Sequence, residues 1–118
     1  MARSDGTEPH DLLPLPVAAF HILLSLSDQD RHGYSIMREI ASRSGDGFRL
    51  GPATLYTTIK RLLADGLVEE LDERPDPDMD DQRRRYYRLT RFGRRVAKAE
   101  LARLQSLVQH ARVSLARG

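Results

Sequence analysis

The chain has 118 residues, of which 40% are hydrophobic and 31% charged, and its formal net charge is +2, a composition that predicts a single soluble globular domain. It contains no cysteine, which excludes disulfides, a thiol nucleophile and cysteine-based zinc sites. No apolar run approaches the roughly 20 residues that span a bilayer, and residues 1–11 lack the apolar segment of a signal peptide. We therefore expect a cytoplasmic protein without a membrane partner.

The charges are distributed unevenly along the chain. Residues 67–82 carry a net charge of −7, whereas residues 83–118 carry +10. A local concentration of basic groups matters more for nucleic-acid binding than the total charge does. The basic excess, which begins at Arg83, therefore makes the C-terminal part of the chain a candidate for contact with nucleic acid.

The N-terminal part predicts an arm followed by a helix. Residues 1–11 are polar and without a repeating pattern, and we expect them to form a flexible N-terminal arm. A first helix should begin near Pro16 and end near Leu26. Almost every position in it is apolar, so it should be buried on more than one side. His21 lies within this helix, and we interpret it as a structural histidine rather than as a pH-sensitive or ligand-binding group.

A second helix should follow a polar turn. The turn occupies residues 27–32, and an apolar stripe within residues 33–44 predicts the helix, which a glycine then ends. Residues 46–50 form a short connector. Phe48 and Leu50 alternate in it, and this alternation favours a small strand.

Residues 51–66, GPATLYTTIKRLLADG, form the segment around which the chain is organised. Pro52 suits the first position of a helix, and Gly66 suits the left-handed turn that ends one. At about 100° per residue, one face of this helix is an apolar stripe. That stripe consists of Leu55, Ile59, Leu62 and Leu63. The opposite face carries Ala53, Thr54, Thr57, Lys60, Arg61 and Ala64.

The chemistry of that opposite face fits the major groove of DNA. Small residues allow close approach, threonine contacts bases or phosphates, and lysine and arginine reach phosphates or guanine. An ordinary surface helix with a solvated polar face is the alternative for this helix taken alone. The elements that follow favour the DNA-binding interpretation.

A long hairpin should follow the helix. Residues 67–71 and residues 83–89 have the composition of strands, and residues 72–82 between them are acidic, contain two prolines and predict a loop. Tyr86 and Tyr87 face opposite sides of the second strand, so one of them should enter the core. The other can reach DNA or cover the sheet.

Thr90 is a good N-cap for a last helix, which should run from Arg91 to about Ala116. Apolar residues recur along it at spacings of four and three, as in a coiled coil. A seam of this length needs a partner, and the same helix of a second copy is the expected one. Packing along the chain's own domain is the alternative. The expected dimer interface consists of Leu101, Leu104, Val108, Ala111 and Leu115.

This order of elements predicts a mainly α fold with a small β-hairpin, a winged helix-turn-helix followed by a long C-terminal dimerisation helix. We assign residues 12–90 to the DNA-binding domain and residues 91–118 to the dimerisation helix. The basic strand of the hairpin would lie against the phosphate backbone beside the helix at residues 51–66.

Three segments in combination resemble the PadR family of bacterial transcriptional regulators. They are GPATLYTTIKRLLADGLVEE at residues 51–70, HGY at residues 32–34 and RRRYYRLTRFGRR at residues 83–95. The resemblance covers roughly residues 15–110 and is to the smaller subclass with a single C-terminal helix. It implies homodimers that bind palindromic operators in double-stranded DNA, mostly as repressors. The DNA-binding residues implied are Thr54, Tyr56, Thr57, Lys60, Arg61, Arg83, Arg84 and Arg85.

The resemblance leaves room for a small-molecule effector, whose pocket would be lined by Phe20, Leu24 and the apolar positions of the last helix. The acidic loop at residues 72–81 departs from the family, because an acidic tip is repelled by phosphate. It either points away from DNA, is disordered or screens non-specific binding. DNA binding would need no metal and no cofactor.

Two other classes of function are weighed against the regulator. A winged helix can also be a protein-protein interaction module whose basic surface faces an acidic protein. An enzyme is not expected, because the four histidines are far apart and no phosphate-binding or nucleophile motif is present. Asp76, Asp78 and Asp80 alternate as in a calcium loop, but Pro77 interrupts them and the glycine and glutamate of an EF-hand are missing.

Overall fold

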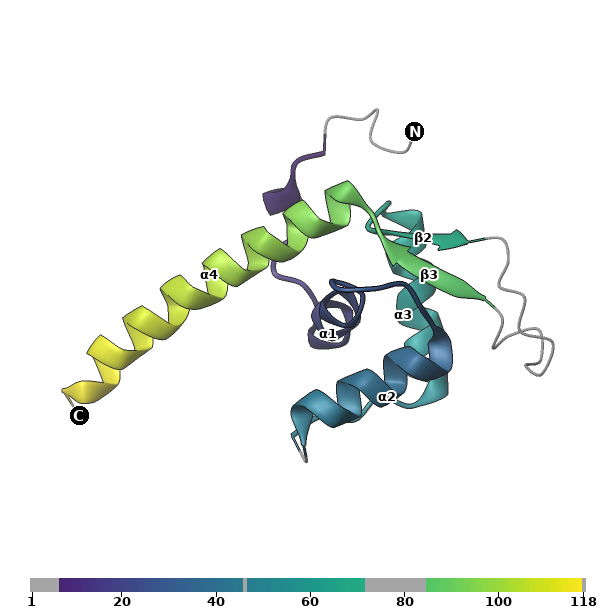
Figure 1. Cartoon of the computed structure of the whole chain (residues 1–118). Coiled ribbons are helices and arrows are strands. Elements are labelled where there is room, and N and C mark those ends of the chain that lie inside the picture. Colours follow the sequence, from purple (N-terminus) through teal and green to yellow (C-terminus); the bar gives the residue numbers. More distant parts are fainter. Residues whose placement is uncertain (1–6, 46, 72–84, 118) are drawn as a thin grey trace.

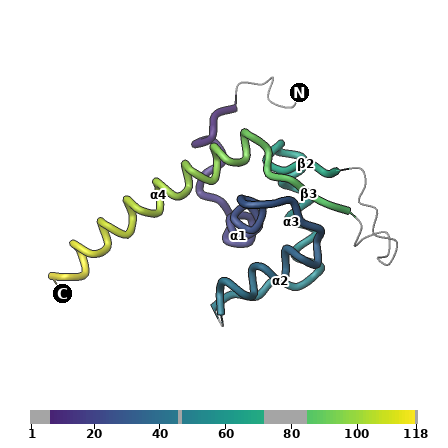
Figure 2. The backbone as a smooth tube through the Cα atoms, in the orientation of Figure 1, coloured from purple at the N-terminus to yellow at the C-terminus, as the bar shows by residue number. Residues whose placement is uncertain are grey.

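The computed structural model describes residues 7–45, 47–71 and 85–117. This part of the chain folds into four α-helices, one short 3-10 helix and a three-stranded sheet (Figures 1 and 2). In chain order the elements are η1 (Pro9–Leu12), α1 (Val17–Ser25), β1 (Arg31–His32), α2 (Gly33–Ser44), α3 (Pro52–Ala64), β2 (Val68–Leu71), β3 (Tyr86–Leu89) and α4 (Arg91–Ala116). Three helices, a hairpin and a long final helix make a winged helix-turn-helix, which confirms the predicted fold class.

The core forms around α1, which packs against α2, α3 and α4 (Figure 1). Burial of α1 on more than one side is confirmed, since Ile22 and Leu23 are fully buried. Val17 and Leu24 remain exposed on the same helix. The fully buried hydrophobic side chains of the domain are Ile22, Leu23, Ile36, Ile40, Leu55, Ile59, Leu67 and Val96.

The sheet has the order β1-β3-β2, and both pairings are antiparallel. The predicted hairpin is thereby confirmed in its two strands, while its loop lies outside the described residues. Tyr87 is buried in the core, as expected for one of the two tyrosines. Tyr86 faces the other way and meets the ring of His32 edge to face, with the ring centroids 5.2 Å apart. It therefore covers the sheet.

The third strand is not where the sequence pattern indicated. Within the described residues of the 46–50 connector there is no strand, and the ring of Phe48 instead stacks on His21 with the centroids 4.3 Å apart. The short strand lies at Arg31–His32, inside the expected polar turn, and pairs with β3. Two residues are too few to show a periodic pattern, and the pairing is with residues far along the chain, so no local signal marks this strand.

The junction between the sheet and α4 is held by a threonine and a glycine. The Thr90 hydroxyl donates to the Gly66 carbonyl at 2.7 Å and accepts from the Gly93 N–H at 2.8 Å, which confirms the predicted N-cap. A Cβ at Gly93 would lie 2.0 Å from the Leu67 carbonyl oxygen. The helix can therefore approach the backbone before β2 only where it has no side chain, which gives a physical reason for the T-x-x-G part of the RLTRFG sequence.

The arm expected at residues 1–11 differs from the structure at its C-terminal end. Pro9–Leu12 forms η1, which packs against α4, and residues 1–6 lie outside the described residues. After η1, the Leu15 N–H donates to the buried Glu100 carboxylate of α4 at 3.3 Å. Leu12 and Leu13 also pack against the core. The leucines of the alternating Leu-Pro run therefore hold residues 9–13 against the domain, although the polar residues 1–11 taken alone predict a flexible arm.

The long last helix runs from Arg91 to Ala116, as predicted. Its first turns join the core through Val96, which is fully buried, and Phe92, which is partly buried. The C-terminal part of α4 extends away from the other elements, so the end of the helix lies far from the sheet (Figure 1). The C-terminal half of α4 is therefore left to solvent or to a partner.

Candidate nucleic-acid interface

The two faces of α3 are separated as the sequence predicts. On the inner face Leu55, Ile59 and Leu62 are buried, and Leu63 is partly buried. The outer face is exposed over its whole length, and it comprises Ala53, Thr54, Thr57, Lys60, Arg61 and Ala64. Burial of the apolar stripe therefore fixes the orientation of the helix, and it presents the threonines and the two cations to solvent.

Tyr56, the remaining residue of the implied α3 set, lies at the edge between the two faces. Tyr56 is half-buried, and its hydroxyl oxygen lies 2.2 Å from the position that a Cβ on Gly33 would take, too close for a side chain there. Gly33 is the first residue of α2. The ring of Tyr56 thus packs α3 against the start of α2. The tyrosine of the segment at residues 51–70 fits only because the segment at residues 32–34 has a glycine at its centre. This contact favours a packing role for Tyr56.

The start of α2 is held in a similar way. His32 is the N-cap of α2, and its Nδ1 accepts from the Ser35 N–H at 3.1 Å. The same residue pairs with β3 and contacts Tyr86. The HGY segment therefore joins the helix-turn-helix to the wing, and it fixes the position of α3 relative to β3.

Arg85 brings the basic side of the wing beside α3. Its guanidinium is more than half exposed and lies 3.6 Å from the Glu70 carboxylate of β2. On β3 itself, Arg88 lies 3.2 Å from Asp30 and 3.8 Å from Glu69. Arg83 and Arg84, which were predicted to contact DNA with Arg85, lie outside the described residues.

A hollow of about 310 Å³ lies between α3 and the hairpin. It brings together Lys60, a predicted residue on the outer face of α3, and Arg85 of the wing. Ile59 and Leu63 contribute apolar side chains to its lining. Burial raises the pKa of Tyr87, which also lines the hollow, to about 12, with a further contribution from Glu70. The Tyr87 phenol is therefore neutral at physiological pH. The hollow is lined by Tyr56, Ile59, Lys60, Leu63, Glu70, Arg85 and Tyr87.

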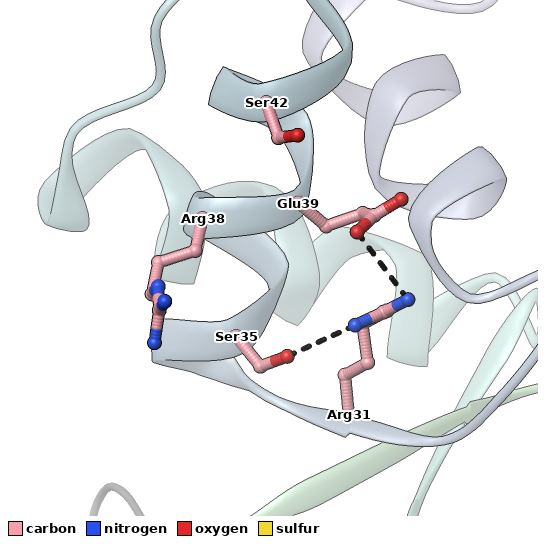
Figure 3. A pocket seen from close by; sticks show the side chains of 5 residues that line it. All are labelled: Arg31, Ser35, Arg38, Glu39 and Ser42. Carbon is pink, nitrogen blue, oxygen red and sulfur yellow. Dashed lines mark hydrogen bonds and ion pairs between the residues drawn. The ribbon is translucent and has the colours of Figure 1, made fainter.

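A second hollow, of about 260 Å³, lies against α2 and was not predicted (Figure 3). Arg31 occupies its base: its side chain donates to the Ser25 carbonyl at 2.6 Å and to the Ser35 hydroxyl at 3.1 Å, and it lies 3.5 Å from Glu39. Arg31 therefore clamps the end of α1 to α2. Arg38 extends away from this cluster and stays exposed (Figure 3).

Arg38 is a cation that sequence reasoning missed. Its guanidinium lies 5.7 Å from the centre of the exposed Tyr34 ring, so α2 also presents a basic and aromatic surface. In helix-turn-helix proteins the helix before the recognition helix crosses the phosphate backbone. Arg38 lies on the polar side of the second predicted helix, and that position could have identified it as a candidate phosphate contact.

The predicted seam on α4 is only partly covered by the chain itself. Leu101 and Val108 are each 50% exposed and Leu115 is 79% exposed, whereas Leu104 and Ala111 are half-buried. Leu107 and Val113 add further exposed apolar surface to the same half of the helix. Exposed apolar surface of this extent on one helix is typical of an interaction site.

Two negative findings concern the described part of the chain. It contains no group of three or more histidine, aspartate or glutamate side chains able to hold a metal ion. The alternating aspartates at residues 76–80 lie outside it. None of its helices combines the length and the apolarity needed to cross a bilayer.

Comparison with known proteins identifies the family. Residues 22–99 match the Transcriptional regulator PadR-like family. The Transcriptional regulator Rv3488 of Mycobacterium tuberculosis is 36% identical over 89 residues, which are 75% of this chain and 77% of that protein. Uncharacterized protein X of Lysinibacillus sphaericus is 36% identical over 73 residues, and the match spans 62% of this chain and 64% of that protein, less than two thirds of its length.

A solved structure shows the same fold. Bacillus subtilis PadR, crystallised in complex with operator DNA, superposes with a TM-score of 0.64 at 20% sequence identity, over 75% of this chain and 48% of that one. The matched family is one of transcriptional regulators and not of enzymes, and the match covers both the helix-turn-helix and the first turns of α4. The chain belongs to the PadR-like family of transcriptional regulators.

Proposed function

We propose that the chain is a sequence-specific DNA-binding repressor that acts in the cytoplasm as a homodimer on an inverted-repeat operator. One observation carries this proposal: Lys60 on the exposed polar face of α3 and Arg85, directly before β3, border one hollow. Cations from two elements then face the same side of the molecule. The exposure of Thr54, Thr57 and Arg61 on the same helix supports the proposal, as does the structural similarity to a PadR protein bound to operator DNA.

In the proposed complex α3 enters the major groove and the wing follows the phosphate backbone. Thr54, Thr57, Lys60 and Arg61 make the groove contacts, and Arg83, Arg84 and Arg85 contact phosphates. Tyr56 contributes by holding α3 against Gly33. The exposed cation of Arg38 on α2 adds a phosphate contact.

The dimer is proposed to form through the C-terminal half of α4. The uncovered seam residues Leu101, Val108 and Leu115 would pack against the same helix of a second copy, together with Leu104 and Ala111. A two-fold dimer places two α3 helices about 34–36 Å apart, or a multiple of that, and so selects an inverted repeat. A small-molecule effector bound near Phe20, Leu24 and α4 would act by changing that separation.

Fluorescence anisotropy on the chain's own upstream DNA and on a scrambled duplex, at several salt concentrations, tests the proposal. The wild type should bind the upstream duplex selectively, and its affinity should fall steeply with salt. Lys60→Ala and Arg61→Ala should each weaken binding by about 1–3 kcal/mol and reduce the salt slope by about 1. The matched control is Lys98→Ala, which removes an exposed cation from α4.

Unchanged affinity and salt slope in both α3 variants would contradict the assignment of α3 as the recognition helix. Equal, weak binding of the wild type to every duplex would contradict sequence-specific binding to the upstream region. It would favour a protein-protein interaction module with the same basic surface.

A further inference from the structure

The cations of the candidate interface fall into two groups. Among the described residues, no acidic side chain forms an ion pair with Lys60 or Arg61 of α3. In the wing, by contrast, Arg85, directly before β3, is paired with Glu70, and Arg88 of β3 is paired with Asp30 and Glu69. The described part of the wing therefore neutralises its own positive charge, whereas the recognition helix does not.

Strand register places Glu70 on the side of the hairpin that faces α3. Glu70 lies opposite Tyr87, the buried tyrosine, whereas Glu69 lies opposite Arg88 on the other face. Since side chains alternate along a strand, Glu70 borders the hollow and Glu69 does not, in agreement with the residues that line it. The carboxylate beside Arg85 is thus within the hollow that Lys60 also borders.

The lining of the hollow therefore already includes one anionic group, Glu70, together with the cations of Lys60 and Arg85. The Glu70 side chain is 36% exposed and Arg85 is 59% exposed, so another anion can reach the guanidinium. A pair this exposed and 3.6 Å apart is weak, because water and salt screen it. An arginine guanidinium can exchange a carboxylate for a phosphate, since both present oxygens that match its fork.

We infer that this hollow binds a backbone phosphate of duplex DNA between Lys60 and Arg85, and that Glu70 is the internal anion which this phosphate displaces from Arg85. The inference rests on the proposed function and adds a specificity-determining residue to it. Glu70 lowers the affinity of the wing for phosphates in general, because every phosphate must break the Arg85–Glu70 pair. Duplexes that also satisfy the outer face of α3 then gain a larger relative advantage.

The salt dependence of binding to a duplex of arbitrary sequence tests the inference with the full chain. Glu70→Gln should bind such a duplex several-fold more tightly than the wild type at low salt. Its plot of log affinity against log salt should be steeper by up to about 0.9, the value for one additional phosphate contact. Glu69→Gln is the matched control, because it makes the same charge change one residue away on the opposite face. Its slope should stay at the wild-type value, since Arg88 keeps its closer pair with Asp30. Thermal melts of both variants verify the fold.

The Arg85→Gln background separates a local effect from a general one. Without Arg85 no cation is released when Glu70 is neutralised, so Glu70→Gln should leave the slope of the Arg85→Gln variant unchanged. Equal steepening by Glu69→Gln and Glu70→Gln, or steepening that persists without Arg85, would overturn the inference and leave the proposed function standing. Failure of the wild type to bind any duplex, even at low salt, would overturn both.

Inorganic phosphate has the same chemistry as the proposed ligand, and a buffer comparison distinguishes the two sources. Duplex binding is measured in sodium phosphate and in sodium chloride at matched ionic strength. If the hollow binds the DNA backbone, Arg85→Gln should bind the duplex more weakly than the wild type in sodium chloride, and this difference should narrow in sodium phosphate because free phosphate competes for the same site. Equal duplex affinities of the two proteins in sodium chloride, with phosphate changing only the wild type, would assign the hollow to free phosphate and overturn the assignment to DNA.

Discussion

The first ten residues of α4 and the remainder of the helix carry similar apolar repeats, but the chain covers only the first. Val96 is fully buried and Glu100 is almost so, whereas Val108 is 50% exposed and Leu115 is 79% exposed. The first segment lies against α1 and η1 and approaches Leu67 at Gly93, while the second extends beyond the other elements (Figure 1). An apolar repeat thus indicates a helix face that needs to be buried, and the length of the rest of the domain decides whether the chain itself can bury it.

The contact of the buried segment with Leu67 should be the most sensitive point of the helix. Gly93→Ala adds a methyl group 2.0 Å from a backbone oxygen, which cannot rotate away as a side chain could. We expect a loss of about 3 kcal/mol or more in the free energy of unfolding, measured by urea denaturation.

Gly51→Ala is the control for that substitution. A Cβ at Gly51 meets nothing within 4 Å, and the loss there should stay below about 1 kcal/mol. Equal losses in the two variants would show that the close approach at Gly93 does not determine how α4 docks.

An added charge on the exposed segment should leave the monomer folded but weaken the proposed dimer. Val108→Asp places a carboxylate within the proposed seam, where a partner helix would have to bury it. We expect dimer association to weaken by at least about 2 kcal/mol, roughly 30-fold in the dissociation constant. Analytical ultracentrifugation at several concentrations measures this change.

Gln109→Asp adds the same charge to the neighbouring residue of α4, on a different side of the helix, and should leave association as it is. The far-ultraviolet circular dichroism of both variants should match the wild type. A Val108→Asp protein of unaltered dimer mass would place the dimer contact on another surface.

The smallest effect is expected at the boundary between the two segments, where Glu100 joins α4 to the N-terminal segment. Its carboxylate accepts two hydrogen bonds from Arg103, at 2.7 and 2.8 Å, and one from the Leu15 N–H. The bond from Arg103 lowers the pKa of Glu100 below its ordinary value of 4.5, although burial opposes the shift. Glu100→Gln should cost about 1 kcal/mol at neutral pH, since an amide can keep part of these bonds.

The pH dependence of that difference follows from the direction of the shift. A carboxylate with a lowered pKa in the folded state stabilises the fold above its unfolded pKa, and the contribution disappears as the pH falls through the folded value. The difference in unfolding free energy between wild type and Glu100→Gln should therefore be constant near neutrality. It should begin to shrink below about pH 4.5 and disappear as the pH falls through the lower pKa of the folded state. A gap that persists to much lower pH would show that the charge of Glu100 is not what joins the two elements.

Much of the fold could be predicted because its signals are local. Pro52 and Gly66 mark the ends of α3, Thr90 caps α4, and the apolar stripe of α3 predicts both its buried and its exposed face. Of the implied DNA-binding residues, the four with side chains on the outer face of α3 are exposed as expected. Helix caps and stripes depend on residues within a few positions of one another, so the sequence shows them directly.

The remaining features depend on residues far apart in the chain. The strand at Arg31–His32 exists because β3 pairs with it, and the packing role of Tyr56 depends on the absence of a side chain at Gly33. Arg38 becomes a candidate for phosphate contact because its helix, α2, packs against α3. The helices, the hairpin strands, the outer face of α3 and the resemblance to a regulator family all follow from the amino-acid sequence. That Lys60, Arg85 and Glu70 border one hollow does not, because this arrangement results from the packing of α3 against the hairpin.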